Sequence, residues 1–185
     1  MPFPKCKYKV YKNALKLPDI IFEYIVDQKK NSYVIFNDES NDEKRRQFDF
    51  KCKIGKHISK KLQNFIEKKG FREKKVNDLV IIHSTELCKR QQLHYDYDLQ
   101  RLRSLDDKDY PFGMLIGVQN NSRFIVYNEL IQKKQTIHFN KGDIVMFRGD
   151  IRHAGAEYYS NNTRLHAYVD SMEYKREKNQ TYLKM

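Results

Sequence analysis

The chain has 185 residues, and its 36 Lys and Arg against 24 Asp and Glu give a formal net charge of +12. This length suits a single domain with a sizeable core, and no apolar run approaches the roughly 18 residues that a membrane span needs. The amino terminus lacks the apolar core of a signal peptide, and the three cysteines, Cys6, Cys52 and Cys88, include no close pair. We therefore expect an intracellular protein, cytoplasmic or nuclear, without a zinc site.

The positive charge is concentrated in the first 76 residues. Residues 1–76 hold 20 Lys and Arg against 10 Asp and Glu, a net charge of +10, whereas residues 77–185 hold 16 against 14, a net charge of +2. Such a basic flank attracts nucleic acid or another polyanion electrostatically. Lysine-rich surfaces are also commonly just solvated, so the flank leaves both interpretations open.

Within this flank one helix is indicated clearly. Residues 56–69 place apolar side chains at helical spacing, and Gly70 ends the pattern. Upstream, residues 19–26 suit a short helix or strand, and residues 51–54 suit a strand after a charged loop at 37–47. The apolar positions of the predicted helix are Ile58, Leu62, Phe65 and Ile66.

From residue 77 onward the pattern changes to short strands separated by Gly and Asn turns. Residues 77–170 are typical of an all-β core, with flanking helices, in a double-sheet jelly roll of the cupin type. Residues 97–110 form a polar segment that suits a helical turn or a lid, and residues 171–185 form a polar tail. The expected strands are 78–83, 91–97, 112–118, 123–127, 135–139, 144–147, 151–154 and 164–169, with 112–118 and 123–127 as a hairpin.

Residues 142–170 carry the most informative pattern. Two Gly-Asp turns frame an apolar strand, after which His153 lies on a second strand. A polar loop at 157–162 then leads to a return strand that begins with Arg164. If that loop closes a hairpin, Arg164 pairs near Gly155 and faces the same side as His153, because strand side chains alternate with period two.

Upstream, His94 and Asp96 are two positions apart. On a strand such residues project to one face, so an imidazole and a carboxylate can bind one metal together, with His153 as the third ligand. Two histidines and one carboxylate are the ligand set of non-haem Fe(II) oxygenases. The planar fork of Arg164 suits a bidentate bond to the far carboxylate of a 2-oxo acid.

The His-x-Asp pattern by itself is weak, because in about one of every two such chains an acid follows a histidine by two places. The combination of His-x-Asp with the Gly-Asp strands, with His153 and with Arg164 on the return strand is more specific. The other histidines, His57, His83 and His138, have no acid two places on and are interpreted as structural.

At these residues the chain resembles the Fe(II)/2-oxoglutarate-dependent dioxygenases. Their pattern is His-x-Asp, a long spacer, a second His and then an Arg, and here the spacing from His153 to Arg164 is 11. The sequence segments around residues 92–96 and 142–155 resemble those of the phytanoyl-CoA-hydroxylase-like branch and its small viral or protist relatives. The resemblance covers roughly residues 78–170.

The resemblance implies a set of cofactors and roles. Fe(II) would be held by His94, Asp96 and His153, the catalytic group. The co-substrate 2-oxoglutarate would bind through Arg164, with molecular oxygen as oxidant and ascorbate in support. His166 stands where relatives often carry a small hydroxyl residue that touches the same carboxylate, and it either makes that contact or packs. The implied reaction is hydroxylation or oxidative demethylation of an unidentified substrate.

Two interpretations from other classes stay open, a non-catalytic cupin-like binding module and a basic nucleic-acid-binding protein. Within the enzyme class, alkylation-repair relatives usually carry a further Arg six residues after the co-substrate Arg, whereas this chain has Asp170. Prolyl hydroxylases commonly use Lys where this chain has Arg164. Neither difference excludes a protein or nucleic-acid substrate.

Overall fold

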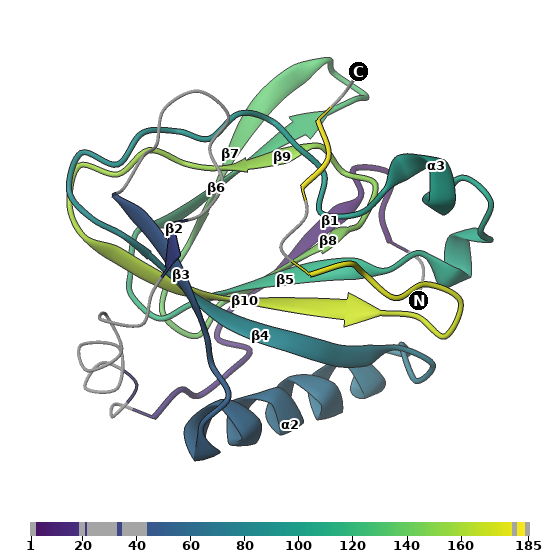
Figure 1. The fold of residues 1–185 in the computed structure, drawn as a ribbon, viewed down its shortest axis with the longest axis horizontal. Coiled ribbons are helices and arrows are strands. Elements are labelled where there is room, and N and C mark those ends of the chain that lie inside the picture. Colours follow the sequence, from purple (N-terminus) through teal and green to yellow (C-terminus); the bar gives the residue numbers. More distant parts are fainter. Residues whose placement is uncertain (1–2, 19–20, 22–32, 35–43, 179–180, 184–185) are drawn as a thin grey trace.

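Two antiparallel β-sheets face each other, and a long helix covers the outer side of the larger sheet (Figure 1). The structure is a computed structural model, and it describes residues 3–18, 21, 33–34, 44–178 and 181–183. The larger sheet has the strand order β1-β8-β5-β10-β4-β3-β2, and the smaller has the order β7-β6-β9. This is the all-β, two-sheet class that the sequence predicts.

The larger sheet consists of β1 (Tyr8–Tyr11), β2 (Tyr33–Val34), β3 (Arg45–Asp49), β4 (Lys75–Ser84), β5 (Phe112–Gly117), β8 (Ile144–Arg148) and β10 (Asn162–Asp170). The smaller sheet consists of β6 (Ser122–Asn128), β7 (Lys133–Phe139) and β9 (His153–Gly155). The helices are α2 (Lys53–Lys68), α3 (Leu99–Leu102) and the 3-10 helix η2 (Asp107–Asp109). None of the helices in the described ranges is long and apolar enough to cross a membrane.

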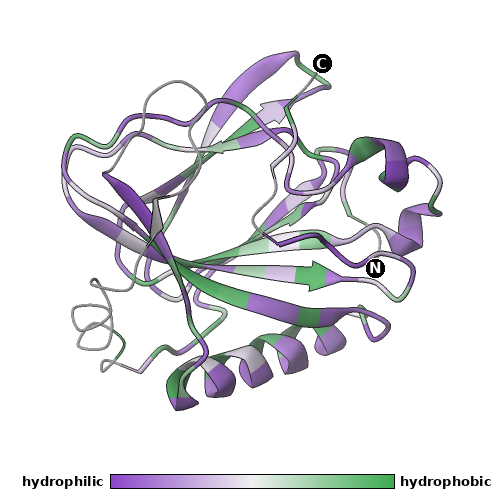
Figure 2. Cartoon of the chain, in the orientation of Figure 1, coloured by the Kyte–Doolittle hydropathy of each residue, from purple (hydrophilic) through white to green (hydrophobic). Residues whose placement is uncertain are grey.

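Helix α2 forms because one of its faces is apolar and both of its ends are capped. At the start, the Cys52 sulfur accepts a hydrogen bond from the Gly55 backbone N–H at 3.5 Å. After the end, Gly70 has a φ of 90°, the left-handed conformation that favours glycine. Figure 2 shows the outer side of the helix as mainly hydrophilic. The side chains buried against the sheet are Ile58, Leu62 and Ile66.

The start of this helix corrects one prediction. The sequence pattern predicts a strand at residues 51–54, but Lys53 and Ile54 belong to the first turn of α2. Gly55 makes the close approach possible, since a Cβ there would come within 1.8 Å of the Phe50 carbonyl oxygen. The strand lies earlier, at β3, which begins inside the segment predicted as a charged loop. Its inward side chains include the buried Arg45 and Gln47, which hide the apolar alternation of a strand.

Both predicted hairpins are wrong, for the same physical reason. The chain crosses between the sheets at each of these turns instead of folding back within one sheet. Strand β5 pairs with β8 and β10, whereas β6 pairs with β7 and β9. In the same way β9 belongs to the smaller sheet and β10 to the larger one. Turn residues look alike in both cases, because a sandwich crossover needs the same chain reversal as a hairpin.

The remaining strand predictions hold in part. Residues 78–83, 135–139, 144–147 and 164–169 lie within β4, β7, β8 and β10. Residues 91–97 form only isolated bridges, at His94 and Tyr95, and the 97–110 segment contains α3 and η2. The expected element at 19–26 lies, apart from Ile21, outside the described residues.

Strand β10 lies between β4 and β5, and its two faces carry different chemistry. One face, with Leu165, Ala167 and Val169, belongs to the apolar core shared with α2. By strand alternation the other face points toward the smaller sheet, and there stand Arg164 and His166. Because polar side chains on an inward face are costly unless they have partners, this face marks the site.

Truncation of the helix contact tests the core assignment. Leu62→Ala should lower the free energy of unfolding by roughly 2–5 kcal/mol, because Leu62 is fully buried and its removal leaves a cavity. Lys60→Ala, on the exposed side of the same helix, should change it by no more than about 0.5 kcal/mol. Urea unfolding followed by circular dichroism measures both values, and equal losses would contradict the assigned helix face.

Candidate metal centre

Three predicted ligands meet between the two sheets. His94, Asp96 and His153 are buried, and each offers a ligand atom, with these atoms all within 4.8 Å of one another. The backbones of His94 and His153 exchange two hydrogen bonds, of 2.8 and 2.9 Å, as an antiparallel bridge. This bridge attaches the His-x-Asp segment to the free side of β9, and it brings the two imidazole ring centroids to 4.7 Å.

Backbone carbonyls select the tautomer of both imidazoles. His94 Nδ1 lies 2.9 Å from the Gln92 carbonyl oxygen, and His153 Nδ1 lies 3.0 Å from the Ile151 carbonyl oxygen. A carbonyl oxygen only accepts, so each Nδ1 carries the hydrogen and each Nε2 keeps a lone pair in the neutral ring. Burial and the neighbouring His153 lower the pKa of His94 to about 4, which keeps this ring neutral at pH 7.

The carboxylate of Asp96 lies among the Nε2 atoms. Its Oδ2 is 3.4 Å from His153 Nε2, and its Oδ1 is 3.9 Å from His94 Nε2. Burial raises the pKa of Asp96, but contacts with the surrounding imidazoles in their protonated form, His153 first, outweigh burial and hold this pKa below its usual range. With the rings neutral, a cation bound among the Nε2 atoms would take over that role. Oδ2 has no hydrogen-bond partner among the described residues. The Asp96 carboxylate and the Nε2 lone pairs of the two histidines together form a donor set that suits a divalent cation.

Arg164 reaches the site from the opposite sheet, and not from a hairpin with His153 as predicted. Arg164 is 2% exposed, and its guanidinium donates from Nη1 to the Ser84 hydroxyl at 3.2 Å. It also lies over the Tyr158 ring at 5.2 Å. The described part of the chain offers it no carboxylate within ion-pair distance. A buried cation in this state is suited to an anion as counter-charge.

His166 lies two positions further along β10, and it faces the carboxylate of Asp96. Its Nε2 is 3.5 Å from Asp96 Oδ2, and its ring stacks on Tyr168 with centroids 4.1 Å apart. Burial lowers the pKa of His166 to about 3, so the ring is neutral. The described residues leave this Nε2 without a hydrogen-bond partner. In this position His166 adds a third imidazole nitrogen beside the two of the predicted ligands.

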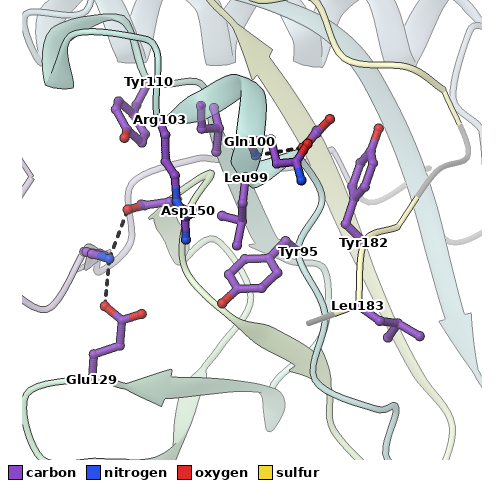
Figure 3. A pocket seen from close by; sticks show the side chains of 12 residues that line it. Tyr95, Leu99, Gln100, Arg103, Tyr110, Glu129, Asp150, Tyr182 and Leu183 are labelled. Carbon is purple, nitrogen blue, oxygen red and sulfur yellow. Dashed lines mark hydrogen bonds and ion pairs between the residues drawn. The ribbon is translucent and has the colours of Figure 1, made fainter. Parts of the chain in front are cut away.

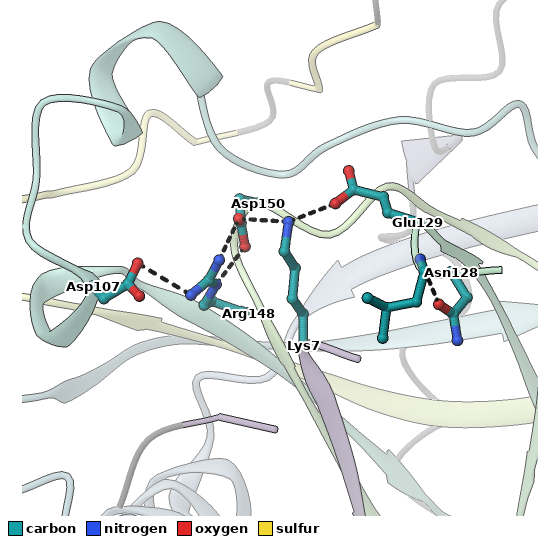
Figure 4. A network of polar contacts seen from close by, with 7 residues as sticks. Lys7, Asp107, Asn128, Glu129, Arg148 and Asp150 are labelled. Carbon is teal, nitrogen blue, oxygen red and sulfur yellow. Dashed lines mark hydrogen bonds and ion pairs between the residues drawn. The ribbon is translucent and has the colours of Figure 1, made fainter. Parts of the chain in front are cut away.

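The turn that leads into His153 is fixed by an ion-pair network (Figure 4). Arg148 makes two bonds of 2.7 Å to the Asp150 carboxylate. Lys7, just before β1, lies 3.0 Å from the same carboxylate and 2.8 Å from Glu129. Ion pairs shared by several partners hold geometry better than single surface pairs. The network therefore holds the chain at the entrance of β9.

Tyr95, between the two ligands of the His-x-Asp segment, points into a separate pocket of about 540 Å³ (Figure 3). Its backbone pairs with that of Tyr182 through two hydrogen bonds of 2.9 Å. Leu99 and Tyr110 also line this pocket. Strand-like alternation separates the pocket from His94 and Asp96, which face the space between the sheets.

The other histidines lie outside the ligand group. His57 and His138 are exposed, and the buried His83 shares a hydrogen bond of 2.9 Å with the Thr163 hydroxyl. Sequence reasoning missed two residues next to Arg164, namely Arg45 and Ser84. Arg45 stands in a run of charged residues, and Ser84 ends an apolar strand, so neither carries a motif that singles it out.

Comparison with known proteins identifies the class of fold. No protein-family model and no curated protein sequence matches the chain. Solved structures do match at low sequence identity, among them a member of the 2OG-Fe(II) oxygenase family and proteins with 2-oxoglutarate bound. The likeness establishes that the chain has the jelly-roll fold of these oxygenases, which confirms the predicted fold class.

Three of these structures span most of both chains. The non-heme alpha ketoglutarate dependent carbocyclase SnoK from nogalamycin biosynthesis has a TM-score of 0.69 at 11% identity, over 90% of this chain and 80% of that one. HygX from Streptomyces hygroscopicus, with nickel and 2-oxoglutarate bound, has 0.67 at 7%, over 94% and 86%. The viral collagen prolyl hydroxylase of Paramecium Bursaria Chlorella virus-1, in its 2-oxoglutarate complex, has 0.59 at 14%, over 88% and 95%.

Substitution of single ligands tests the metal centre. His94→Ala, Asp96→Ala or His153→Ala should each abolish or greatly weaken anaerobic binding of Fe(II) near 1:1, because two remaining ligands hold the ion poorly. His138→Ala, which removes an exposed histidine from β7, should bind as the wild type does. Isothermal titration in an anaerobic cell measures the affinities, and unchanged binding in all three variants would refute the site.

Proposed function

We propose that the protein is an Fe(II)- and 2-oxoglutarate-dependent dioxygenase that hydroxylates, or oxidatively demethylates, its substrate. The observation that carries the proposal is the pairing of two buried and incomplete sites between the sheets. One is the group of His94, Asp96 and His153, and the other is the Arg164 guanidinium. A metal with a chelating 2-oxo dicarboxylate would complete both together.

The donor set fits Fe(II). Two neutral imidazole nitrogens and one carboxylate on one side of the ion leave other positions for the co-substrate and oxygen. When bound, Fe(II) with 2-oxoglutarate and oxygen supplies the oxidising power for hydroxylation of a carbon–hydrogen bond, and ascorbate would keep the metal reduced. The chain itself orients the ligands through the Gln92 and Ile151 carbonyls, which fix both rings.

Arg164 fits the far carboxylate of 2-oxoglutarate. Its planar fork can make two parallel charge-assisted bonds, and the anion would supply the counter-charge that the surrounding residues do not. The Ser84 hydroxyl fixes one edge of the guanidinium, and the Tyr158 ring lies against its face. The guanidinium is therefore held in place before the co-substrate binds, which reduces the entropy lost on binding.

The wall around His153 excludes water. The rings of Phe124 and Phe147 lie 5.2 and 4.9 Å from the His153 ring, and both side chains are buried. An apolar wall on this side keeps the dielectric constant low, so the charged contacts of the site are stronger than in water.

The finer branch of the family and the contact of His166 with the co-substrate are also part of the proposal. The assignment to the phytanoyl-CoA-hydroxylase-like branch depends on the sequence segments around residues 92–96 and 142–155. A contact between His166 and 2-oxoglutarate rests on its position beside Arg164, two residues along the same face of β10. The nature of the prime substrate is left open by these residues.

Replacement of Arg164 tests the proposal most directly. Arg164→Ala should weaken 2-oxoglutarate binding by about 3 kcal/mol or more, the value of two charged hydrogen bonds at ~1.5 kcal/mol each. Fe(II) should still bind, because Arg164 is not a ligand, and Arg164→Lys should recover only part of the loss. The exposed Arg72→Ala is the matched control.

The measurements are equilibrium binding of 2-oxoglutarate to the Fe(II) protein and succinate release with ascorbate and oxygen. Uncoupled turnover makes the second assay independent of the prime substrate. If the wild type binds no 2-oxoglutarate when iron is present, or if Arg164→Ala binds it equally well, the dioxygenase assignment fails. The cupin-like binding module would then be the better description.

A polyanionic partner, such as nucleic acid, is a second candidate function that one observation favours. Four lysines of α2 are exposed on its outer face, and none of them makes an ion pair with a described residue. Positive charge held on one rigid face is the electrostatic pattern of nucleic-acid-binding surfaces. The four residues are Lys53, Lys56, Lys60 and Lys68.

Salt dependence tests this surface. If α2 binds a single strand, its affinity for a fluorescent oligonucleotide should fall steeply with salt. Each lysine that neutralises a phosphate contributes roughly 0.7 to the slope of log K against log salt, so replacement of the four lysines by Gln should make the slope shallower. Gln at the exposed Lys133 and Lys134 of β7 is the control. Binding that does not vary with salt would leave the α2 lysines as solubility features.

A further inference from the structure

We propose that Arg45 is a positioning residue for co-substrate binding. It acts through Ser84 on Arg164, and its own guanidinium is held by carbonyl oxygens of the chain before His94 and after His153. The inference rests on the proposed dioxygenase function and adds a residue from β3, which lies outside the part of the chain that resembles the family.

The Arg45 side chain occupies a central place. It is fully buried, with an exposed fraction of 0%. Its Nη2 donates to the carbonyl oxygens of Lys89, at 2.9 Å, and of Ala156, at 2.6 Å. Lys89 precedes the His-x-Asp segment, and Ala156 follows β9. One guanidinium therefore joins the chain before His94 to the chain after His153.

The link to Arg164 runs through a single hydroxyl. Arg45 Nε lies 3.4 Å from the Ser84 Oγ, and Arg164 Nη1 lies 3.2 Å from the same atom. A serine hydroxyl has two acceptor lone pairs, so it can accept from both guanidiniums at once. Because the first bond restricts where the hydroxyl oxygen can be, it also fixes the acceptor that orients Arg164.

Gly155 shows how closely this guanidinium is enclosed. A Cβ at that position would come within 2.7 Å of Arg45 Nη1 and within 2.4 Å of the Gln91 side-chain oxygen. Gln91 in turn accepts a hydrogen bond of 2.9 Å from the Gly155 backbone N–H. The end of a long side chain normally moves away from such a methyl group, but Arg45 is held by three acceptors. A methyl group here fits only if some of these hydrogen bonds break, so it would displace the guanidinium from its acceptors without removing its charge.

The consequence is selective for the far carboxylate. If Arg45 acts through Ser84, its loss leaves Arg164 less ordered, and ordering that side chain on binding costs affinity. This cost lowers the affinity only of a co-substrate that contacts Arg164. 2-Oxovalerate, in which a methyl group replaces the far carboxylate of 2-oxoglutarate, should not sense it. A merely structural role would weaken both acids alike.

The test measures both acids by isothermal titration against the Ni(II)-loaded protein. Arg45→Lys keeps the charge but not the fork, and it should raise the Kd of 2-oxoglutarate about tenfold, the effect of roughly one hydrogen bond. The Kd of 2-oxovalerate should change by less than about twofold. Arg46→Lys, on the opposite face of β3, is the matched control and should leave both values unchanged.

Two further variants protect the test against misfolding and identify the path. Gly155→Ala should reproduce the selective loss while Arg45 remains in the chain. In a Ser84→Ala background, Arg45→Lys should have little additional effect on 2-oxoglutarate, since coupled residues are non-additive.

Three outcomes would overturn the proposal. Arg45→Lys and Gly155→Ala could both bind 2-oxoglutarate as the wild type does, or each could weaken the two acids equally. Additive effects of Arg45→Lys and Ser84→Ala would exclude the path through the hydroxyl. If the wild type binds Ni(II) but no 2-oxoglutarate, the proposed function fails as well, and this result is distinguished by the wild type alone.

Discussion

The structure depends on the burial of ionisable side chains between two apolar layers. Asp96, Arg164 and Arg45 all lie in the interior, where an ion without compensating contacts costs several kcal/mol. The fold offsets this cost with hydroxyls, backbone carbonyls and aromatic faces around Arg45 and Arg164, and with imidazoles around Asp96. The groups whose partners are incomplete face the space between the sheets. That arrangement is what distinguishes this interior from an ordinary apolar sandwich core.

The position of the His-x-Asp segment in this interior is fixed by backbone pairing more than by side-chain packing. The His-x-Asp segment is no regular strand, yet His94 exchanges two backbone hydrogen bonds with His153, and Tyr95 exchanges two with Tyr182. Because both sides of the segment are paired, its side-chain directions are set before any ligand binds. The ion pairs of Asp150 fix the turn before His153 in the same way. Such preorganisation lowers the ordering cost that a metal or co-substrate has to offset.

The larger sheet also connects the site to the amino-terminal part of the chain. Strand β1 pairs with β8, and β3 pairs with β4, so residues from the basic flank lie beside the strands that carry the site. Arg45 follows from this pairing. Its strand lies next to β4, which places the guanidinium at Ser84, at the end of that strand. Among the many exposed cations of the basic flank, Arg45 is therefore a buried arginine with a specific structural place.

The sequence by itself determined the local features. Short apolar runs between turn residues predict β4 and β8, short strand-type segments predict β7 and β10, helical spacing predicts α2, and two-residue spacing puts His94 and Asp96 on one face. What only the tertiary structure decided is which strands meet. Turn residues report that the chain reverses but not into which sheet it goes, so the loop between β9 and β10 predicts a hairpin although these strands lie in facing sheets. Likewise, the sequence does not distinguish a buried arginine from an exposed one. The position of Arg45 beside Ser84 follows only from the pairing of β3 with β4.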